Sequence, residues 1–415
     1  MWSKFFKNTN QQIIVAFLAA VLTGYLHQPF LYTAASTISL LFINILKCIS
    51  IPLIFLSLVA TVGSMENFEE FKRLGKRVVK YTLLTTFIAS FVALAIFLII
   101  DPVRSGISLT EFSSDIIQQN TNGKASYLTY FINIVPSNVL SPFVENHVIS
   151  VLFLAILCSL AILTLPTQHR APLQEFFSGL YGMTMKIATW VVCLMPIGIW
   201  SFVTLFIRDM RDGMIISQLA LYLCCVLLAN LLQGLVILPA FLKIKRLSPI
   251  KLAKGMMPAL SIAFFSKSSS ATLPMAMRCA EENLGIDKKI TSFAFPLCTT
   301  INMNACAAFI LTTVLFVSIA EGMTFTLVDY IMWAVIATIA AVGNAGVPMG
   351  CFFLSSALLA SLNVPLNLMG VILPFYALID MLETALNVWS DSCVVAVVNK
   401  EVNEEVRELP LTPSL

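Results

Sequence analysis

Five polar residues interrupt a long apolar segment near the C-terminus of the chain. At about 100° per residue they fall on one stripe of an α-helix. A carboxylate at bilayer depth costs about 2.5–3.5 kcal/mol on insertion scales, so three of them on one stripe are expected to face a polar cavity that holds cations. The apolar segment spans 371–398, and its polar residues are Asp380, Glu383, Thr384, Asn387 and Asp391.

Composition places this segment in a helical membrane protein. The 415 residues are 58% hydrophobic and only 11% charged, and the mean hydropathy is +0.90. Soluble globular chains are about 45–50% apolar and about 25% charged. The sequence therefore predicts an all-α polytopic membrane protein in contact with the lipid bilayer.

Cysteine and histidine give no sign of a metal centre. The ten cysteines lie mostly inside apolar runs without C-x-x-C spacing, which favours packing residues or free thiols over a disulfide framework or a zinc site. The three histidines stand at segment ends. We expect no cofactor, no nucleic-acid partner and no enzymatic activity, because no base constellation accompanies the serine-rich segment described below.

Hydropathy predicts six spans before residue 243. Dense basic clusters at 72–80 and 243–254 place their loops on the cytoplasmic side, and the depth of residues 101–147 stays open. With the rest of the chain this parity predicts that both termini are cytoplasmic. The six predicted spans cover residues 12–28, 35–62, 81–100, 148–165, 179–206 and 215–242.

The last third of the chain departs from simple hydropathy. Residues 249–281 are broken at 267–274 by lysine, serines and proline, with basic residues on both flanks, which predicts a re-entrant hairpin. A span at 290–318 is interrupted by polar residues at 299–304, and residues 328–362 repeat the hairpin pattern around a glycine- and proline-containing tip. Two such tandem units, entering from opposite sides, predict the binding site of an inverted-repeat transporter.

Four motifs in this order resemble those of the dicarboxylate/amino acid:cation symporters, the glutamate transporter homologues. The resemblance implies eight transmembrane helices plus two re-entrant hairpins, a homotrimer, and a multi-pass protein of the cell membrane (the bacterial inner membrane is expected). The motifs are Ser268-Ser269-Ser270-Ala271-Thr272-Leu273-Pro274, Asn302-Met303-Asn304-Ala305-Cys306, Ala345-Gly346-Val347-Pro348, and the helix that carries Asp380, Thr384, Asn387 and Asp391.

The resemblance also implies a division of the chain. Scaffold helices would occupy 1–76 and 106–210. A third transport-domain helix would occupy 77–105, the transport-domain core 211–400, and a cytoplasmic tail 401–415.

The resemblance assigns roles to individual residues of a substrate site. Asp380 and Thr384 would hold the α-amino group of an amino acid, and Asn387 with Ser269 its α-carboxylate, which matches an anion to an ammonium and neutral donors to a carboxylate. The full substrate set is Ser268, Ser269, Ser270, Cys306, Val347, Gly350, Asp380, Glu383, Thr384 and Asn387.

Sodium is the expected coupling ion. Asp391 would ligate it together with backbone carbonyls near Asn302 and Asn387, because a hard cation prefers oxygen ligands. The full sodium set is Thr85, Thr86, Asn302, Asn304, Asn387 and Asp391.

The side-chain end of the substrate site departs from the family pattern. Members with acidic substrates place an arginine where this chain has Glu383 and a threonine where it has Cys306. The arginine clamps a second carboxylate, so glutamate there predicts repulsion of an acidic side chain unless it is protonated. We expect a neutral polar or cationic substrate, and Lys267 could partly offset the negative stripe.

Coupling residues are altered as well. Asn304, Tyr376 and Thr82 stand where the family has an aspartate, another carboxylate and a tyrosine. Fewer coupled sodium ions, or a proton on Glu383 in place of one, are expected. Taken alone, Tyr376 is interpreted as a packing residue, and Asn302 and Asn304 as interhelical hydrogen-bond formers. A glutamate/aspartate or C4-dicarboxylate symporter, or a transport-poor channel or sensor, remains an alternative.

Overall fold

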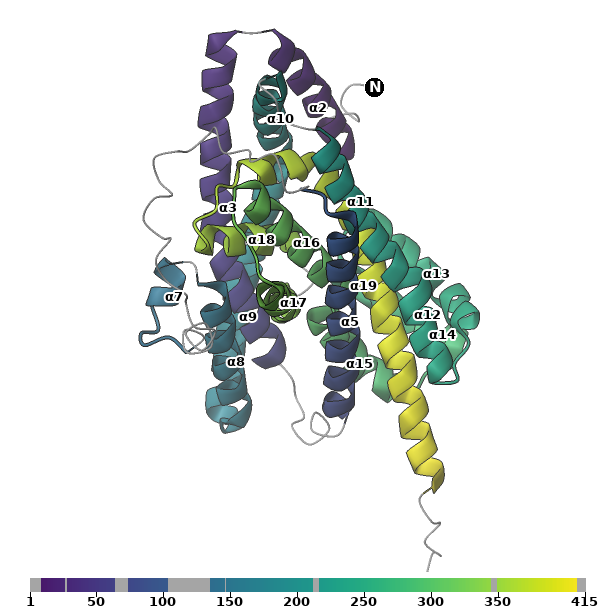
Figure 1. Ribbon diagram of the computed structural model, residues 1–415. Coiled ribbons are helices and arrows are strands. Elements are labelled where there is room, and N and C mark those ends of the chain that lie inside the picture. The colour runs from purple at the N-terminus through teal and green to yellow at the C-terminus, as the bar shows by residue number, and fades with distance from the viewer. Residues whose placement is uncertain are drawn as a thin grey trace, which may run out of the picture.

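The computed structural model describes residues 9–26, 28–63, 74–103, 135–145, 147–211, 216–344 and 349–408. Across these ranges the ordered elements are helical and no strand is present (Figure 1). The helices are α2 (Thr9–Tyr25), α3 (Pro29–Gly63), α5 (Lys76–Ile100), α7 (Ser141–Val144), α8 (Val148–Thr164), α9 (Thr167–Cys193), α10 (Met195–Arg211), α11 (Ile216–Leu232), the π-helical η4 (Gln233–Ile237), α12 (Leu238–Ile244), α13 (Pro249–Ser266), α14 (Ser269–Leu284), α15 (Lys288–Ile301), α16 (Asn304–Ala320), α17 (Leu327–Val342), α18 (Gly350–Ser361) and α19 (Asn367–Glu408).

The helices form two packed groups. In the first, α3 contacts α8, α9 and α10, and α10 also lies along α2. In the second, α19 packs against α13, α15 and α16, while α16 contacts α5, α11, α17 and α18. Figure 1 shows α19 crossing the molecule beside α5 and α11. The groups meet where α10 touches α19 and α18 touches α3, so the polar stripe of α19 lies in the second group.

Two breaks interrupt the helices where polar and proline-containing motifs predict them. The first lies at Lys267, which takes a left-handed conformation with φ of 55°, and the Ser268 side chain then accepts the Ala271 N–H to start α14. The second separates α15 from α16 at Asn302 and Met303. Both predicted interruptions are therefore confirmed, and at the first of them the Ser268 side chain replaces a backbone partner.

The second predicted hairpin has its arms in α17 and α18. Thr326 and Asp329 form a capping box at the start of α17, which ends at Val342. The predicted tip residues 345–348 lie outside the described residues. The arms contact each other and cover α16 on one side.

Four helical stretches of the described chain are long and apolar enough to cross a membrane: Lys76–Ile100, Ser217–Ile244, Lys288–Ala320 and Asn367–Glu405. The predicted first and fourth spans appear as α2 and α8, apolar helices of 17 residues each. The last helix extends to Glu408, so residues 401–408 of the predicted tail continue α19.

The predicted fifth span, 179–206, corresponds to a bent pair of helices. The structure has α9 and α10 there, with a bend of 48° between them. Pro196 is the second residue of α10, where its missing N–H would have no intrahelical partner. A proline inside a continuous span would instead remove a hydrogen bond and clash with the preceding turn.

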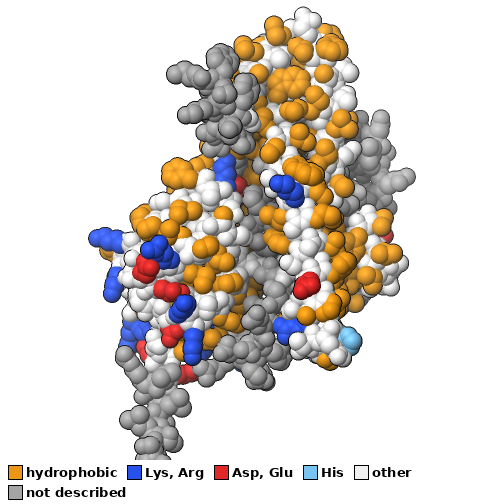
Figure 2. All heavy atoms as spheres, turned by 180° about the vertical axis from the view of Figure 1, so that it is seen from behind, with side chains coloured by type: hydrophobic (Ala, Val, Ile, Leu, Met, Phe, Trp, Pro, Cys, Tyr) orange, Lys and Arg blue, Asp and Glu red, His pale blue; other side chains and the backbone are white. Residues whose placement is uncertain are grey.

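The surface agrees with a membrane setting. Figure 2 shows hydrophobic side chains over much of one face, while lysine, arginine, aspartate and glutamate gather around one end of the region of α12–α14. Exposed large apolar side chains such as Leu22, Phe30, Ile99 and Trp190 would be costly in water but face lipid at no such cost.

Candidate substrate and cation site

All five polar residues of the α19 stripe are buried. Their side chains fall on one face, as the spacing predicts, and α19 packs against α5, α15, α16, α18 and the helix pair α13–α14. Buried carboxylates are tolerated only with partners or ligands. The exposed fractions are 5% for Asp380, 1% for Glu383, 6% for Thr384, 4% for Asn387 and 1% for Asp391.

Asp391 is held by neutral donors from the α15–α16 break. Asn302 Nδ2 donates to Asp391 Oδ1 at 2.9 Å, and Thr299 Oγ1 lies 3.4 Å from Oδ2. Asn302 Nδ2 also reaches Ser390 Oγ at 2.9 Å. The carboxylate thus has hydrogen-bond donors on both oxygens and no cation beside it in the described chain.

Oxygen atoms converge next to this carboxylate. Thr85 Oγ1 lies 3.2 Å from Asn302 Oδ1 and 3.4 Å from Asn304 Oδ1, and Thr86 Oγ1 donates to Asn304 Oδ1 at 2.7 Å. Asn304 Nδ2 completes the link to α19 by donating to Ser390 Oγ at 2.7 Å. Five of the six predicted sodium residues are therefore brought together, in a cluster rich in the oxygen ligands that hard cations prefer.

The two asparagines also join helices, as their packing interpretation predicts. Because they connect α5 with α19, hydrogen bonding and cation binding are compatible roles for the same groups. A neighbouring contact comes from η4, where Gln233 Nε2 donates to the Thr85 carbonyl at 3.2 Å. Single π-helical turns are frequent at functional sites, and the sequence analysis did not identify Gln233.

Asn387 and Thr384 are fixed by backbone groups. Asn387 Oδ1 accepts the Ala305 N–H at 3.0 Å, which satisfies an N–H at the start of α16 and leaves the amide NH₂ as the donor end. Thr384 Oγ1 donates to the Asp380 carbonyl at 2.7 Å. Asn387 therefore lies beside the break between α15 and α16, adjacent to the predicted sodium cluster.

Asp380 and Glu383 share one tyrosine. Tyr376 Oη lies 3.3 Å from Asp380 Oδ1 and 3.3 Å from Glu383 Oε2. The tyrosine is fully buried, and its ring packs against Phe309 and Phe352. Its interpretation as a packing residue alone is wrong, because its hydroxyl is the group placed between the two carboxylates.

Thiols and an amide line the far side of Glu383. Cys351 interacts with both Glu383 and Cys306, and Asn344 Nδ2 lies 3.5 Å from Cys351 Sγ. Gly350 allows Asn344 to pack closely, because a Cβ at position 350 would stand 1.4 Å from Asn344 Oδ1. Cys306 thus lies near Glu383, as expected from the sequence. Asn344 and Cys351 were not predicted as site residues.

The serine-rich break approaches the stripe through its lysine. Lys267 interacts electrostatically with Asp380, as the predicted offset of the negative stripe requires. Ser268 caps α14, Ser269 is buried and Ser270 is exposed, and in the described structure their side chains form no hydrogen bond with α19. Val347 lies outside the described residues.

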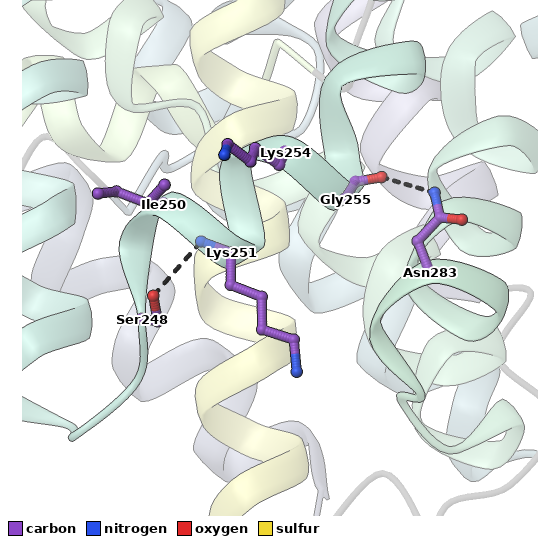
Figure 3. A pocket seen from close by; sticks show the side chains of 6 residues that line it. All are labelled: Ser248, Ile250, Lys251, Lys254, Gly255 and Asn283. Carbon is purple, nitrogen blue, oxygen red and sulfur yellow. Dashed lines mark hydrogen bonds between the residues drawn. The ribbon is translucent and has the colours of Figure 1, made fainter.

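A separate hollow lies on the surface near the start of α13. It measures about 750 Å³, and Figure 3 shows Ser248 accepting the Lys251 N–H on one side and Asn283 donating to the Gly255 carbonyl on the other. Lys251 and Lys254 are exposed there. None of the predicted site residues lines it, so the polar stripe and this hollow are distinct.

The structure is that of a multi-helix membrane protein in which buried carboxylates lie on one helix between two interrupted helix pairs. Such an arrangement is typical of proteins that bind small polar solutes and cations at membrane depth. The sequence matches the sodium:dicarboxylate symporter family over residues 10–401. The chain belongs to this family. Sodium-coupled transport, rather than an enzymatic reaction, is what this membership indicates.

The chain is similar to amino acid transporters of animals. The chain is 26% identical to a putative sodium-dependent excitatory amino acid transporter, glt-4, of Caenorhabditis elegans, over 89% of this chain and 83% of the relative. It is 28% identical to the neutral amino acid transporter B(0) of Oryctolagus cuniculus, over 85% and 71%. It is 33% identical to excitatory amino acid transporter 3 of Homo sapiens, over 58% and 46%.

Proposed function

We propose that this protein is a cation-coupled symporter that carries an amino acid with a neutral or cationic side chain across the membrane by alternating access. Sodium is the coupling ion, with a proton on Glu383 as a possible substitute for one of the sodium ions. One observation carries the proposal. The same helix has one buried carboxylate, Asp391, beside hydroxyl and amide groups and two further buried carboxylates, Asp380 and Glu383, that lie close together.

The proposed architecture follows the family. Eight spans and two re-entrant hairpins would be divided between scaffold segments (1–76 and 106–210) and transport segments (77–105 and 211–400). The packing of α2, α3 and α8–α10 in one group and α5 with α11–α19 in the other supports this division. A homotrimer in the bacterial inner membrane with cytoplasmic termini completes the proposal.

Substrate contacts are proposed around α19. Asp380 with Thr384 would hold the α-ammonium, and the Asn387 amide with Ser269 and the neighbouring hairpin tip the α-carboxylate. The fixed orientation of Asn387, whose oxygen is occupied by Ala305 N–H, supports a donor role for its NH₂. Glu383 would face the substrate side chain and disfavour a second carboxylate by like-charge repulsion.

Sodium is proposed to bind between Asp391 and the oxygens of Thr85, Thr86, Asn302 and Asn304. Asn304 is uncharged and already bridges Thr86 and Ser390, so within this hydrogen-bonded cluster Asp391 is the only carboxylate. Each carboxylate that a cation site lacks weakens it, because net charge must offset dehydration. We therefore propose fewer than three coupled sodium ions per cycle.

The test is uptake of labelled amino acids into liposomes that contain the purified protein. Sodium and proton gradients are imposed independently, and the panel includes acidic, neutral and cationic amino acids. Uptake of a neutral or cationic amino acid that requires an inward sodium or proton gradient supports the proposal. Selective aspartate or glutamate uptake, or a coupling of three sodium ions, contradicts its substrate or stoichiometry part.

The relative named as a neutral amino acid transporter supports a neutral amino acid as the substrate. The alternative of an acidic substrate would follow the relatives named as excitatory amino acid transporters, and Glu383 opposes it. Exchange of labelled substrate at equal concentrations separates a carrier from a channel. Binding without exchange would indicate a sensor.

A further inference from the structure

We propose that Glu383, Tyr376, Cys351 and Asn344 form a side-chain subsite for the cationic end of a diamino or guanidino amino acid. The inference rests on the proposed function, because it names the substrate class of the same site. Lysine, ornithine and arginine are the simplest members of this class.

The carboxylates of Asp380 and Glu383 have few hydrogen-bond donors. Glu383 Oε1 and Asp380 Oδ2 are buried without a hydrogen-bond partner in the described chain. Their other oxygens share the hydroxyl of Tyr376, whose single proton can point to only one of them at a time. Asp380 also receives a hydrogen bond from the Met349 backbone, while the Cys351 thiol that reaches Glu383 is a weak donor. Two ionised carboxylates can accept about eight hydrogen bonds, so the pair lacks donors.

A third acceptor lies on the other side of Cys351. Asn344 Nδ2 points to the Cys351 and Met303 sulfur atoms at 3.5 and 3.8 Å. Its Oδ1 is buried and, among the described residues, has no hydrogen-bond partner. Buried acceptors of this kind are rare in folded proteins and call for an explanation. A ligand with several N–H groups supplies what all three oxygens lack.

The charges around Glu383 also favour a cation. Every titratable group of the described chain found to interact with Glu383 is an acid, whether carboxylic, phenolic or thiol. Lys267 interacts with Asp380, the neighbouring carboxylate of the stripe. A buried carboxylate without a cationic partner is strongly unfavourable, and a bound cation removes that cost. The interacting acids are Asp380, Tyr222, Tyr376, Cys306 and Cys351.

The spacing of the two carboxylates suits a substrate with two cationic groups. Asp380 and Glu383 are three residues apart on α19, so their Cβ atoms are about 5–6 Å apart, and both carboxylates lie within 3.3 Å of one hydroxyl. If Asp380 takes the α-ammonium, Glu383 lies within one side-chain length of it. An ammonium brings three donors and a guanidinium five in a planar fork that fits a carboxylate.

Other side chains fit less well. A neutral amide brings two donors but leaves the charge of Glu383 uncompensated, and an aliphatic side chain brings none. An acidic side chain adds a third carboxylate to a site already short of donors. The ordering expected from the geometry is cationic, then neutral polar, then aliphatic, then acidic.

Competition between close analogues tests this ordering in liposomes that contain the full-length protein, under an inward sodium gradient. Norleucine has the carbon skeleton of lysine without the terminal ammonium, so the pair isolates one charge. We expect lysine, ornithine or arginine to accumulate, and lysine to compete roughly tenfold or more better than norleucine. Accumulation of norleucine or glutamine with lysine no better than either overturns the inference and leaves the proposed function standing. Failure of every amino acid to accumulate overturns both.

Substitutions of Glu383 link the preference to the residue. Glu383→Gln keeps the shape and removes the charge, and should lower competition by lysine roughly 30-fold or more while norleucine changes by less than about threefold. Glu383→Asp withdraws the carboxylate by one methylene, and should retain cation selectivity but move it from ornithine toward the longer lysine and arginine. Unchanged lysine preference in Glu383→Gln overturns the inference.

A control and a second readout cover variants that transport poorly. Glu282 is exposed on α14 and pairs with Arg278 at 3.0 Å, so Glu282→Gln should leave the preference unchanged. In detergent, lysine should raise the thermal transition temperature of the wild type and of Glu383→Asp more than norleucine does, because a ligand stabilises the form it binds. Equal shifts with lysine and norleucine in both proteins contradict the subsite.

Discussion

The two ends of the α19 stripe hold carboxylates in opposite surroundings. Asp391 receives Asn302 Nδ2 at 2.9 Å on one oxygen and faces Thr299 Oγ1 at 3.4 Å on the other. Asp380 and Glu383, two to three turns earlier, each keep one oxygen without a partner in the described structure. The burial is the same, at 1–5% exposure for the three side chains, so the difference lies in the donors that neighbouring helices provide.

This difference separates two tasks on one helix. A carboxylate held by fixed donors amid hydroxyl and amide oxygens is ready for a small spherical cation, which needs rigid oxygens and no hydrogen bonds. A pair of carboxylates short of donors is suited to a ligand that brings N–H groups of its own. We therefore expect substitutions near Asp391 to change the sodium dependence of transport, and substitutions near Asp380 and Glu383 to change its substrate preference.

The largest effect is expected from Asp391→Asn. Asparagine can still accept from Asn302 Nδ2, so the fold should be kept while the charge of the cation site is lost. We expect the sodium concentration for half-maximal uptake to rise roughly 100-fold or more, because removal of one member of a buried charge pair costs about 3–5 kcal/mol. The measurement is uptake of the best substrate against sodium concentration.

The control for Asp391→Asn is the same substitution at Asp287. That aspartate is exposed and caps α15 by accepting the Lys289 N–H at 2.7 Å, and asparagine caps helices equally well. Asp287→Asn should therefore leave the sodium dependence unchanged. An unchanged sodium dependence in Asp391→Asn would mean that the two ends of the stripe do not differ as proposed.

Tyr376→Phe should give the second largest effect. It removes the hydroxyl shared by the two donor-poor carboxylates, and leaving such groups unsatisfied costs about 1–3 kcal/mol. The matched control is Tyr222→Phe, since Tyr222 is also fully buried but bonds the neutral Thr313 at 2.8 Å, where the net loss is about 1 kcal/mol. Thermal unfolding in detergent should place Tyr376→Phe below Tyr222→Phe, and bound lysine should narrow the gap. The reverse order would contradict a donor shortage.

Most of the residues around Asp391 could be predicted from the sequence, but few of those around Glu383 could. The residues of the proposed cation cluster could be predicted because Asn302, Asn304 and Asp391 stand in motifs that resemble those of the symporter family. The surroundings of Glu383 could not, since Asn344 and Cys351 are unremarkable in their own segments. Only the packing of α16 and α18 against α19 brings them together.

The same limit applies to the fold. Breaks at Lys267 and at Asn302 were predictable from serine, proline and asparagine in apolar runs. The bend between α9 and α10 was not recognised, although Pro196 within the predicted span 179–206 was a signal for it. Hydropathy alone assigned that run to one span, because its apolar content does not change across the bend.

A smaller effect, in the opposite direction, is expected from Asn304→Asp. Aspartate can accept from Thr86 as Asn304 does, and Ser390 can turn its hydroxyl to donate to it. The added charge should lower the sodium concentration for half-maximal uptake about tenfold, because carboxylate count tunes cation affinity. Titration of uptake against sodium measures this, with Asn399→Asp as the control, whose Oδ1 accepts the Asp287 N–H at 3.2 Å away from the cluster. A loss of sodium affinity would show that the cluster does not bind the cation.

The smallest effect is expected at a partly exposed carboxylate near the end of α19, Glu401, which water reaches. It bonds Lys245 Nζ at 2.7 Å and also Tyr81, and its side chain is 26% exposed. Burial opposes the charge of Lys245, but the hydrogen bonds to Glu401 and Tyr81 outweigh it and raise the pKa of the lysine. Any stability from this raised pKa is therefore present at neutral pH and is lost only as the pH rises through it.

Glu401→Gln keeps a hydrogen-bond acceptor for Lys245 and removes only the charge. Because water screens a partly exposed pair, the expected loss is about 0–1 kcal/mol, measured as a thermal transition in detergent, with sodium dependence and substrate preference unchanged. A loss as large as that of Tyr376→Phe would mean that burial does not govern the energy of carboxylates on this helix. The different effects expected at Asp391 and at the Asp380–Glu383 pair could then not be explained by the hydrogen-bond donors around these carboxylates.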